Sequence, residues 1–524
     1  MRRPLALLNA IERAGRRLLG VADAATNRLY GWRFNPLYQS GTIVVAMFLV
    51  LIATGLWLLL FYRVGEPWGS VARLTANPWI GNWVRGLHRY ASAAAIVATV
   101  LHALRMVAQH RFWGPRALAW LSGIVLVGLV LVLGWTGYVM VWDSFGQRLA
   151  IEGARFLDAL PILSEPIGRA FTGERAIPGA FFFLNLFVHV ALPLGLGLVL
   201  WVHVSRLARP TLLPPKRLGW SIVGLLTAVA VLWPLSMAPV ADPFYRPATV
   251  PADYFYAFWL PFSRGIPANA AWLGGGLLVL GLLLVPRLSR GERSRRPPSV
   301  VDEAICTGCW QCFHDCPYDA IRMLGRTDGR ADVVARVSAD LCVSCGICAG
   351  SCAPMGVGPT ERTGRDQLEE IRSFLGSPAR VPGEVIAIAC EYGALHAGGQ
   401  LREAGAVVYP VDCAGNLHSS VIELAIRGGA GGVLVLSCPP RDCRNREGPK
   451  WTGERMYHDR DAELQARVDR RRVALAYAGP GEAREAVEAI GRLKESIAAL
   501  AVPVPAADLD LVAVCETTAA GEAP

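Results

Sequence analysis

The first 290 residues alternate between long apolar stretches and short polar loops. Six of these stretches are long enough to cross a hydrocarbon core of ~30 Å, which takes about 20 helical residues. They run from Thr42 to Tyr62, Tyr90 to Ala108, Ala117 to Trp142, Ile177 to Val204, Leu218 to Val240 and Gly265 to Val285. The pattern therefore predicts an all-α bundle of six transmembrane helices.

Beyond Arg287 the sequence becomes polar, and its apolar runs are short enough for strands. Three such runs are Val385 to Ala389, Val407 to Val411 and Val433 to Leu436, and a helical stretch, Ser419 to Arg427, lies between the last two. Strands that alternate with helices are typical of a parallel α/β sheet. We therefore expect a soluble half that follows the membrane half.

The basic residues are distributed in a way that orients the predicted helices. The chain carries a net charge of +10, and its arginines and lysines concentrate in every second loop. These loops contain Arg105, Arg111 and Arg116, then Arg206, Arg209, Lys216 and Arg217, then Arg287, Arg290, Arg293, Arg295 and Arg296. Because loops rich in Lys and Arg face the cytoplasm, we expect a multi-pass protein of a prokaryotic inner membrane with both termini cytoplasmic. We attribute the positive charge to this topology and not to nucleic-acid binding.

Four histidines lie within the predicted membrane helices as two matched sets. His88 and His102 are fourteen residues apart on the second helix, and His189 and His203 are fourteen residues apart on the fourth. Fourteen residues are nearly four helical turns, so both members of a set face the same way at levels ~21 Å apart. Two facing helices would then form two bis-imidazole sites, the first pair (His88 and His189) and the second pair (His102 and His203).

Two imidazoles are a ligand set for haem iron, and helical bundles hold such cofactors between facing helices. This half of the chain contains no cysteine, which excludes a c-type attachment. We therefore predict two haem b groups. The alternative, lone histidines hydrogen-bonded to neighbouring groups, leaves the matched intervals unexplained.

All thirteen cysteines lie at or beyond Cys306, and thiols grouped this tightly bind metal in a reducing compartment. Eight of them have the spacing of bacterial ferredoxins with two 4Fe-4S clusters, in which the fourth cysteine of each run ligates the other cluster. We assign Cys306, Cys309, Cys312 and Cys352 to cluster 1, and Cys316, Cys342, Cys345 and Cys348 to cluster 2. Zinc is the alternative metal.

A further cysteine group follows the predicted strands of the α/β region. Its members are Cys390, Cys413, Cys438 and Cys443, which we call the four-thiol site. The carboxyl ends of parallel strands meet at one edge of a sheet, so these thiols can converge on one 2Fe-2S cluster. A zinc site or buried structural thiols are the alternatives. Cys515, after a late predicted strand (Leu509 to Val514), could replace one of the four ligands.

Around its histidines the chain resembles the cytochrome b of quinol:cytochrome c oxidoreductases and their photosynthetic relatives. The resemblance rests on Trp83 and Arg85 before His88, Arg105 after His102, Leu192-Pro193 after His189, and the glycines Gly41, Gly55 and Gly137. It implies that Arg85 and Arg105 bind haem propionates, and that the glycines let the flat porphyrin approach the helix backbone. Positive-inside anchoring is the alternative for Arg105.

The same resemblance reaches the segment Pro251 to Phe255, which looks like the family's Pro-Glu-Trp-Tyr quinol site. Here Ala252 stands at the Glu position and Asp253 at the Trp position. Asp253 and Tyr254 are therefore the candidate residues of an outer quinone site. By topology the first histidine pair would hold the outer haem and the second pair the inner haem, near the cytoplasm.

Three stretches of the soluble half look like the iron-sulfur delta subunit of the methyl-viologen-reducing hydrogenases of methanogens. They are residues 411–415, 429–434 and 437–443. The resemblance implies a 2Fe-2S cluster and a place between a dehydrogenase and a heterodisulfide-reductase-type flavoprotein.

These features divide the chain into eight predicted segments. They are a cytoplasmic N-terminal segment (1–40), a four-helix haem-binding core (41–210), two further helices with the quinol-site-like loop (211–290), a basic linker (291–300), a two-cluster 4Fe-4S ferredoxin (301–360), a connector (361–382), a hydrogenase-like 2Fe-2S domain (383–516) and a tail (517–524).

No segment has the pattern of a site for substrate chemistry, such as a Gly-rich dinucleotide loop. We therefore expect an electron-transfer subunit of a quinone oxidoreductase complex, in contact with membrane lipid. It would carry single electrons between quinone and a cytoplasmic flavoprotein, dehydrogenase or hydrogenase partner. The alternatives are a subunit of an electron-bifurcating or energy-coupled enzyme, and a membrane anchor or redox sensor. The dimeric habit of the cytochrome b family suggests a homodimer.

Overall fold

The computed structural model describes most of the chain as two compact units. The described residues are 2–109, 111–161, 166–171, 177–205, 210–242, 244, 253–288, 296–330, 332–377, 381–458, 460 and 462–500. Unit 1 comprises Met1–Pro298, Cys316–Arg322 and Val337–Ser344, and unit 2 comprises Ser299–Asp315, Met323–Arg336 and Cys345–Pro524. The predicted strand Leu509 to Val514, Cys515, Ala252 and the loop arginines Arg206, Arg209, Arg290, Arg293 and Arg295 lie outside the described residues.

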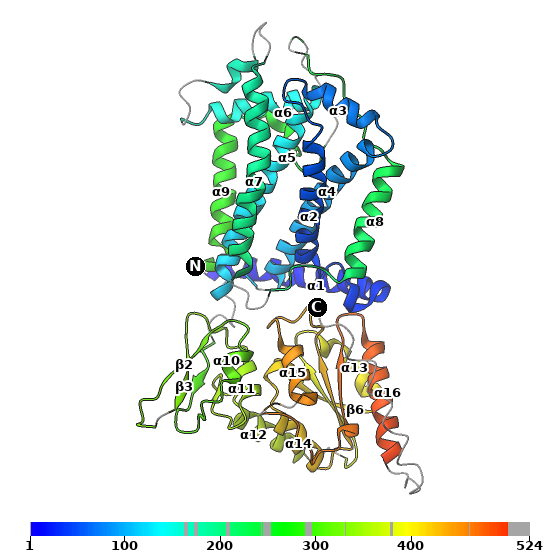
Figure 1. Ribbon diagram of the computed structural model, residues 1–524. Coiled ribbons are helices and arrows are strands. Elements are labelled where there is room, and N and C mark those ends of the chain that lie inside the picture. Colours follow the sequence, from blue (N-terminus) through cyan, green and yellow to red (C-terminus); the bar gives the residue numbers. More distant parts are fainter. Residues whose placement is uncertain are drawn as a thin grey trace. The chain divides into compact units, whose positions relative to one another are not determined.

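Unit 1 is built almost entirely from helices (Figure 1). Its elements are α1 (Arg2–Phe34), α2 (Ser40–Leu59), α3 (Pro67–Ala76), α4 (Gly81–Ala108), η1 (Gly114–Arg116), α5 (Ala117–Val141), α6 (Ser144–Asp158), η2 (Ile167–Phe171), α7 (Gly179–Ser205), α8 (Lys216–Leu232), η3 (Leu260–Gly265) and α9 (Ala268–Leu288). Helix α2 packs on α4, α5 packs on α7, and α8 packs on α4. Apolar faces of neighbouring helices thus bury one another.

Five helices among the described residues are long and apolar enough to cross a membrane, namely α2, α4, α5, α7 and α9. They correspond to five of the six predicted stretches. The sixth stretch, Leu218 to Val240, forms α8, whose 17 residues end at Leu232. Proline disfavours the helical conformation of the residue before it, and Trp233, which precedes Pro234, has left the helix at φ −126° and ψ 72°. Six crossings therefore stay a prediction.

The polar segment between the third and fourth spans is more ordered than its composition indicates. It contains helix α6, which begins where the Asp143 side chain accepts a hydrogen bond from the backbone N–H of Gly146 at 2.9 Å. A carboxylate at this position satisfies a free N–H at the start of a helix. This helix was not predicted from the sequence, although its charged residues Arg148, Glu152 and Arg155 lie together on one helical face.

Unit 2 contains a four-stranded sheet in which all strands are parallel. Its strands are β5 (Val385–Cys390), β6 (Ala406–Val411), β7 (Gly432–Ser437) and β8 (Val473–Tyr477), in the order β6-β5-β7-β8. Val385 of β5 is paired with Ala406 on one side and Gly432 on the other. The predicted parallel sheet and its first three strands are confirmed, whereas β8 was not predicted.

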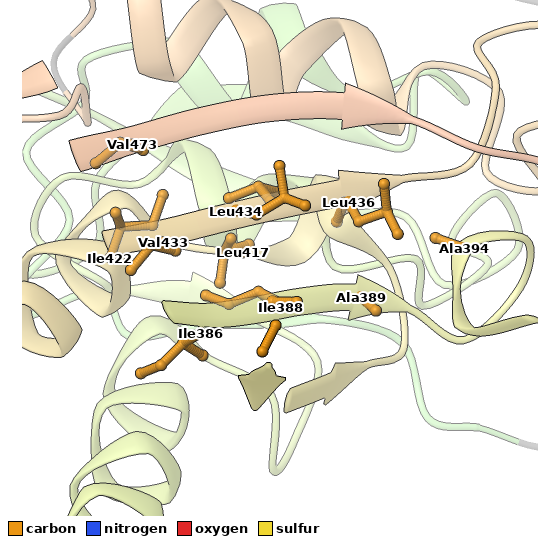
Figure 2. Close-up of a cluster of buried hydrophobic side chains, with 14 of the residues drawn as sticks. Ile386, Ile388, Ala389, Ala394, Leu417, Ile422, Val433, Leu434, Leu436 and Val473 are labelled. Atoms are coloured by element: carbon orange, nitrogen blue, oxygen red, sulfur yellow. The ribbon is translucent and has the colours of Figure 1, made fainter. Parts of the chain in front are cut away.

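The core of this sheet is apolar on both faces. Strands β5 and β7 are buried along their whole length, which explains their unbroken apolar sequence. Figure 2 shows the side chains of Ile386 and Ile388 beside those of Val433, Leu434 and Leu436 on the neighbouring strand. The surrounding helices and turns are α12 (Gly364–Leu375), η5 (Ala394–Ala397), α13 (Gly398–Glu403), η6 (Ala414–Asn416), α14 (Ser419–Arg427), α15 (Gly448–Tyr457), η7 (Arg470–Arg472) and α16 (Ala483–Leu500).

The cysteine-rich region before this sheet consists of short elements. They are β1 (Val300–Val301), α10 (Gln311–Asp315), β2 (Ile321–Gly325), β3 (Val333–Val337), α11 (Ile347–Ser351) and β4 (Val357–Gly358). Strand β1 pairs antiparallel with β4, and β2 pairs with β3. Within unit 2, α10 packs on α11.

Candidate metal centres

Helices α4 and α7 bring the four membrane histidines together as the two predicted pairs. The ring centres of His88 and His189 are 6.5 Å apart, and those of His102 and His203 are 6.4 Å apart. An iron ion held between two imidazoles by bonds of about 2 Å places the ring centres roughly 6 to 6.5 Å apart. Both pairs therefore have the separation that one bis-imidazole iron requires.

Hydroxyl groups on α2 and α5 set the tautomer of three of these imidazoles. The Nδ1 atoms of His88, His189 and His203 lie 2.9, 2.9 and 3.1 Å from the hydroxyls of Thr54, Thr136 and Ser122. Each hydroxyl already donates its own hydrogen to a backbone carbonyl four residues earlier, at 2.7 to 2.9 Å. It must therefore accept from Nδ1–H, which leaves the Nε2 lone pair free for a metal.

A glycine lies against each of the four imidazoles. A Cβ atom at Gly41 would stand 2.9 Å from the nearest atom of the His102 ring, and the corresponding distances are 3.2 Å for Gly55 and His88, 3.3 Å for Gly123 and His203, and 3.1 Å for Gly137 and His189. For Gly41, Gly55 and Gly137, the predicted role of glycine is to make room for a porphyrin. The structure adds that a Cβ atom at Gly41 would force a shift beside His102, whereas at the other three glycines the neighbouring imidazole would have to give by a few tenths of an ångström.

Both arginines with a predicted propionate role have protein partners. The guanidinium of Arg105 is buried and donates to both carboxylate oxygens of Asp23, at 2.8 and 3.1 Å. Arg85 donates to the Thr75 hydroxyl at 3.1 Å and to the backbone oxygen of Leu235 at 3.2 Å. Propionate binding by either residue stays a prediction.

Asp253 of the candidate quinone site is held by hydrogen bonds on both carboxylate oxygens. Oδ2 accepts from Arg89 Nη2 at 2.6 Å and from the Tyr138 hydroxyl. Oδ1 accepts from the backbone N–H groups of Phe255, Tyr256 and Ala257 at 3.0, 2.6 and 2.9 Å. Burial raises the pKa of Asp253, but these bonds and the Arg89 charge outweigh it, and the pKa lies below its ordinary value. The neighbouring Tyr254 is exposed.

The four cysteines assigned to cluster 1 line one hollow in unit 2. Cys306, Cys309, Cys312 and Cys352 surround it, together with Val301, Met323, Ala335 and Val357. The hollow has a volume of about 330 Å³ with its open mouth included. The backbone N–H of Gly356 donates to Cys352 Sγ at 3.2 Å, the kind of bond that tunes an iron-sulfur centre.

The cysteines assigned to cluster 2 are divided between the two units. Cys316 and Cys342 belong to unit 1, where their thiols interact electrostatically, whereas Cys345 and Cys348 belong to unit 2. Backbone N–H groups of Ala320 and Ser344 donate to the first two sulfurs at 3.3 and 3.4 Å. The assignment of the four residues to one cluster stays a prediction.

The cysteines of the four-thiol site converge at the carboxyl edge of the parallel sheet. Cys390 ends β5, Cys413 follows β6, and Cys438 follows β7 directly. Hydrogen bonds join Cys413 to Cys443, Cys443 to Cys438, and Cys438 to Cys390. All four side chains are buried and all four cysteines are free of disulfides.

Helix α15 begins at the four-thiol site, and its N-terminus contributes an electrostatic field that favours thiolates. A Cβ atom on its first residue, Gly448, would lie 3.1 Å from Cys413 Sγ and 3.2 Å from Cys443 Sγ. The N-terminus of a helix carries partial positive charge, which stabilises thiolates. Glycine at this position lets the helix end approach both sulfurs.

The raised pKa values of the cysteine thiols are consistent with sites that bind positively charged iron. Hydrogen bonds between thiols and then burial raise the pKa of Cys413 and of Cys438, and burial with neighbouring thiols raises the pKa of Cys312. Gathered thiolates are thus unfavourable by themselves, and bound iron would compensate their charge. Among the described residues, no group of three or more His, Cys, Asp or Glu side chains has the arrangement of a preformed single-ion site.

Sequence reasoning missed the groups that support the histidines. Gly123, Thr54, Ser122 and Thr136 were not among the expected site residues. A signal was present, since Gly41 and Gly55 on α2, and Gly123 and Gly137 on α5, repeat at the same fourteen-residue interval as the histidines.

Comparison with known proteins finds similarity along three parts of the chain. A chain of the solved structure named "Hyperthermophilic respiratory Complex III" is similar with a TM-score of 0.38 and 17% identity, over 48% of this chain and 75% of that chain. Residues 26–210 match the cytochrome b/b6/petB family, residues 305–356 match the 4Fe-4S dicluster domain, and residues 385–501 match the delta subunit of the methyl-viologen-reducing hydrogenase. The chain therefore carries a cytochrome b/b6 domain, a 4Fe-4S dicluster domain and a hydrogenase delta-subunit-like domain in one polypeptide.

Proposed function

We propose that this chain is a membrane electron-transfer subunit that carries single electrons between a cytoplasmic partner and the quinone pool. The observation that carries the proposal is the spacing of the two imidazole pairs, 6.5 and 6.4 Å between ring centres, within apolar helices. Each pair would hold one haem b. When bound, haems and iron-sulfur clusters supply one-electron transfer.

The soluble half extends the proposed route toward a partner that handles electron pairs. The hollow lined by the cluster 1 cysteines and the four-thiol site would hold a 4Fe-4S and a 2Fe-2S cluster, and cluster 2 would be the second 4Fe-4S centre. The delta-subunit-like domain supports a hydrogenase, dehydrogenase or heterodisulfide-reductase-like flavoprotein as partner. We further propose a homodimer in a prokaryotic inner membrane with both termini cytoplasmic.

The hydrogen bonds of Asp253 favour this function over an energy-coupled or bifurcating one. A bifurcating enzyme needs a working outer quinone site with a group that accepts protons. The Asp253 carboxylate accepts bonds from two side chains and three backbone N–H groups, and these bonds favour its charged form over the protonated form. We therefore propose that the outer site does not oxidise quinol.

The test is spectroscopy of the purified full-length protein, followed by a turnover assay. We expect two low-spin b haems and about ten non-haem irons per chain, with EPR signals of 4Fe-4S and 2Fe-2S clusters. Protein reduced by a viologen dye should then reduce a water-soluble quinone continuously. A single haem, or zinc in place of iron, contradicts the proposal, and intact centres without quinone reduction would favour an anchor or sensor.

A further inference from the structure

A buried arginine joins the four-thiol region to the ferredoxin-like region within unit 2. Arg455 on α15 is 2% exposed, and its Nη2 donates to the backbone oxygen of Gly415 at 2.6 Å, while Nη1 donates to that of Ile347 at 3.3 Å. Gly415 lies two residues after Cys413, and Ile347 directly precedes Cys348. The guanidinium thus links the backbone beside one predicted 2Fe-2S ligand to the backbone beside one predicted cluster 2 ligand.

The junction carries an excess of positive charge. Nη1 of Arg455 also donates to the Ser351 hydroxyl at 2.9 Å, and that hydroxyl donates to Asp315 Oδ2 at 2.6 Å. The other oxygen of Asp315 accepts from Arg460 Nη2 at 2.6 Å. Asp315 thus bonds Arg460 directly and Arg455 only through Ser351, so one carboxylate stands against two guanidinium groups. Burial lowers the pKa of Arg455 to about 10, which leaves it protonated at neutral pH.

The elements that meet at this arginine pack closely because glycines line their contact. A Cβ atom on Gly415 would lie 2.5 Å from Gly448 Cα and 3.1 Å from Ile347 Cγ1. A Cβ atom on Gly350 would lie 2.7 Å from the guanidinium of Arg455. The backbones at Gly415 and Gly448 therefore approach at a distance that only glycine permits, and a side chain at Gly350 would displace the guanidinium of Arg455.

The charge of Arg455 acts on both predicted metal sites. It interacts electrostatically with Cys413 of the four-thiol site and with Cys348 of cluster 2. A positive charge in a buried setting favours the more negative, reduced state of a nearby cluster, and net charge is one determinant of cluster potentials. The same side chain is therefore placed to shift both potentials in one direction.

We propose that Arg455 is a positioning residue at an electron-transfer junction between the four-thiol site and cluster 2, and that it raises the reduction potential of both. Arg455 keeps its proton while one electron moves between the two sites, so that one site is oxidised as the other is reduced. This inference rests on the proposed function, because it takes Cys413 and Cys348 as cluster ligands.

The experiment is an EPR-monitored redox titration of the full-length purified protein and its Arg455→Met variant. Methionine keeps an unbranched apolar stem in place of the arginine stem and removes the charged guanidinium. At a fixed ambient potential, we expect the ratio of reduced to oxidised 2Fe-2S cluster to fall about tenfold, and the same ratio for cluster 2 to fall equally. A tenfold fall corresponds to a reduction potential lowered by about 59 mV for a one-electron couple. Cluster 1 should shift by a smaller factor, because Cys413 and Cys348, and not the Cys352 that follows Ser351, are the thiols in electrostatic interaction with Arg455.

Two controls separate charge from hydrogen bonding. Ser351→Ala removes one hydrogen-bond partner of Arg455 without changing the charge. Arg455→Lys keeps the charge but has fewer hydrogen-bond donors. In both variants the ratio of reduced to oxidised cluster should stay within about threefold of the wild-type ratio. If Arg455→Met loses its clusters, Arg455→Gln carries the same test. Loss of clusters in both neutral variants with retention in Arg455→Lys would overturn the proposal, because the charge would then act in assembly.

Unchanged potentials in a neutral variant with full iron content would also overturn it, and so would equal shifts of all three clusters. These outcomes leave the proposed function standing. A wild-type protein without 2Fe-2S and 4Fe-4S signals would instead refute the proposed function, so the two failures are distinguishable.

Discussion

The two halves of this molecule build their candidate metal sites in different ways. In unit 1 each site consists of one histidine from α4 and one from α7, repeated after fourteen residues. In unit 2 the four-thiol site collects cysteines from the ends of three strands and a following loop, between Cys390 and Cys443. Helix-built sites should therefore behave as separate units, each affected by a change at its own level of the bundle.

The largest expected effect comes from removing one imidazole of the first pair. His189→Leu should reduce haem content from two per chain to one, because His88 alone cannot supply both axial ligands. The second pair lies roughly 21 Å further along the helices and should keep its haem. Pyridine haemochrome analysis with low-temperature optical spectra would measure both.

Phe187→Leu is the matched control, since Phe187 lies on the same helix with an exposed side chain, and it should keep both haems. Two haems in His189→Leu would show that His189 is not a ligand. Loss of both haems would break the comparison, because the two helix-built sites would then depend on each other.

The histidine pairs and the thiol convergence could be predicted because helical period and strand order fix them. The supporting residues could not. Thr136 touches His189 only because α5 packs on α7, and no local pattern states which helices are neighbours. Arg455 is harder still, since a basic residue in a polar helix reads as a surface residue, whereas here it is buried at a junction of distant segments. The end of α8 could have been predicted from Pro234.

An intermediate effect is expected from closing the space beside one imidazole. Gly41→Ala would place a Cβ atom 2.9 Å from Nδ1 and Cε1 of His102, on a neighbouring helix, so either the ring or the helix must shift. We expect either a partial loss of the second-pair haem or a change of about tenfold in its ratio of reduced to oxidised haem at a fixed ambient potential. The first-pair haem should be unaffected. Gly128→Ala on α5 is the control, because its Cβ would meet nothing within 4 Å. Equal effects of both variants on both haems would point to a general loss of helix stability.

The smallest effect should come from the hydroxyl that accepts from His189 Nδ1–H. Thr136→Val keeps the shape of the side chain and removes the acceptor at 2.9 Å, although the imidazole also donates to the backbone carbonyl of Leu133. A weaker acceptor makes the imidazole a weaker donor to iron, which favours the reduced state. The reduction potential of the first-pair haem should therefore rise. In an optical redox titration, its ratio of reduced to oxidised haem at a fixed ambient potential should increase by less than tenfold.

Thr99→Val provides the comparison for this last change, because the Thr99 hydroxyl donates to the backbone oxygen of Ala95 on α4 at 2.7 Å. It should leave both haem potentials in place. If Thr136→Val moved both haems equally, the hydroxyl would be acting through the packing of α5 and α7 and not through its own histidine. A shift confined to the first pair would establish that each level of the bundle carries its own ligands, its own hydroxyl and its own glycines, which is the property that separates these sites from the four-thiol site.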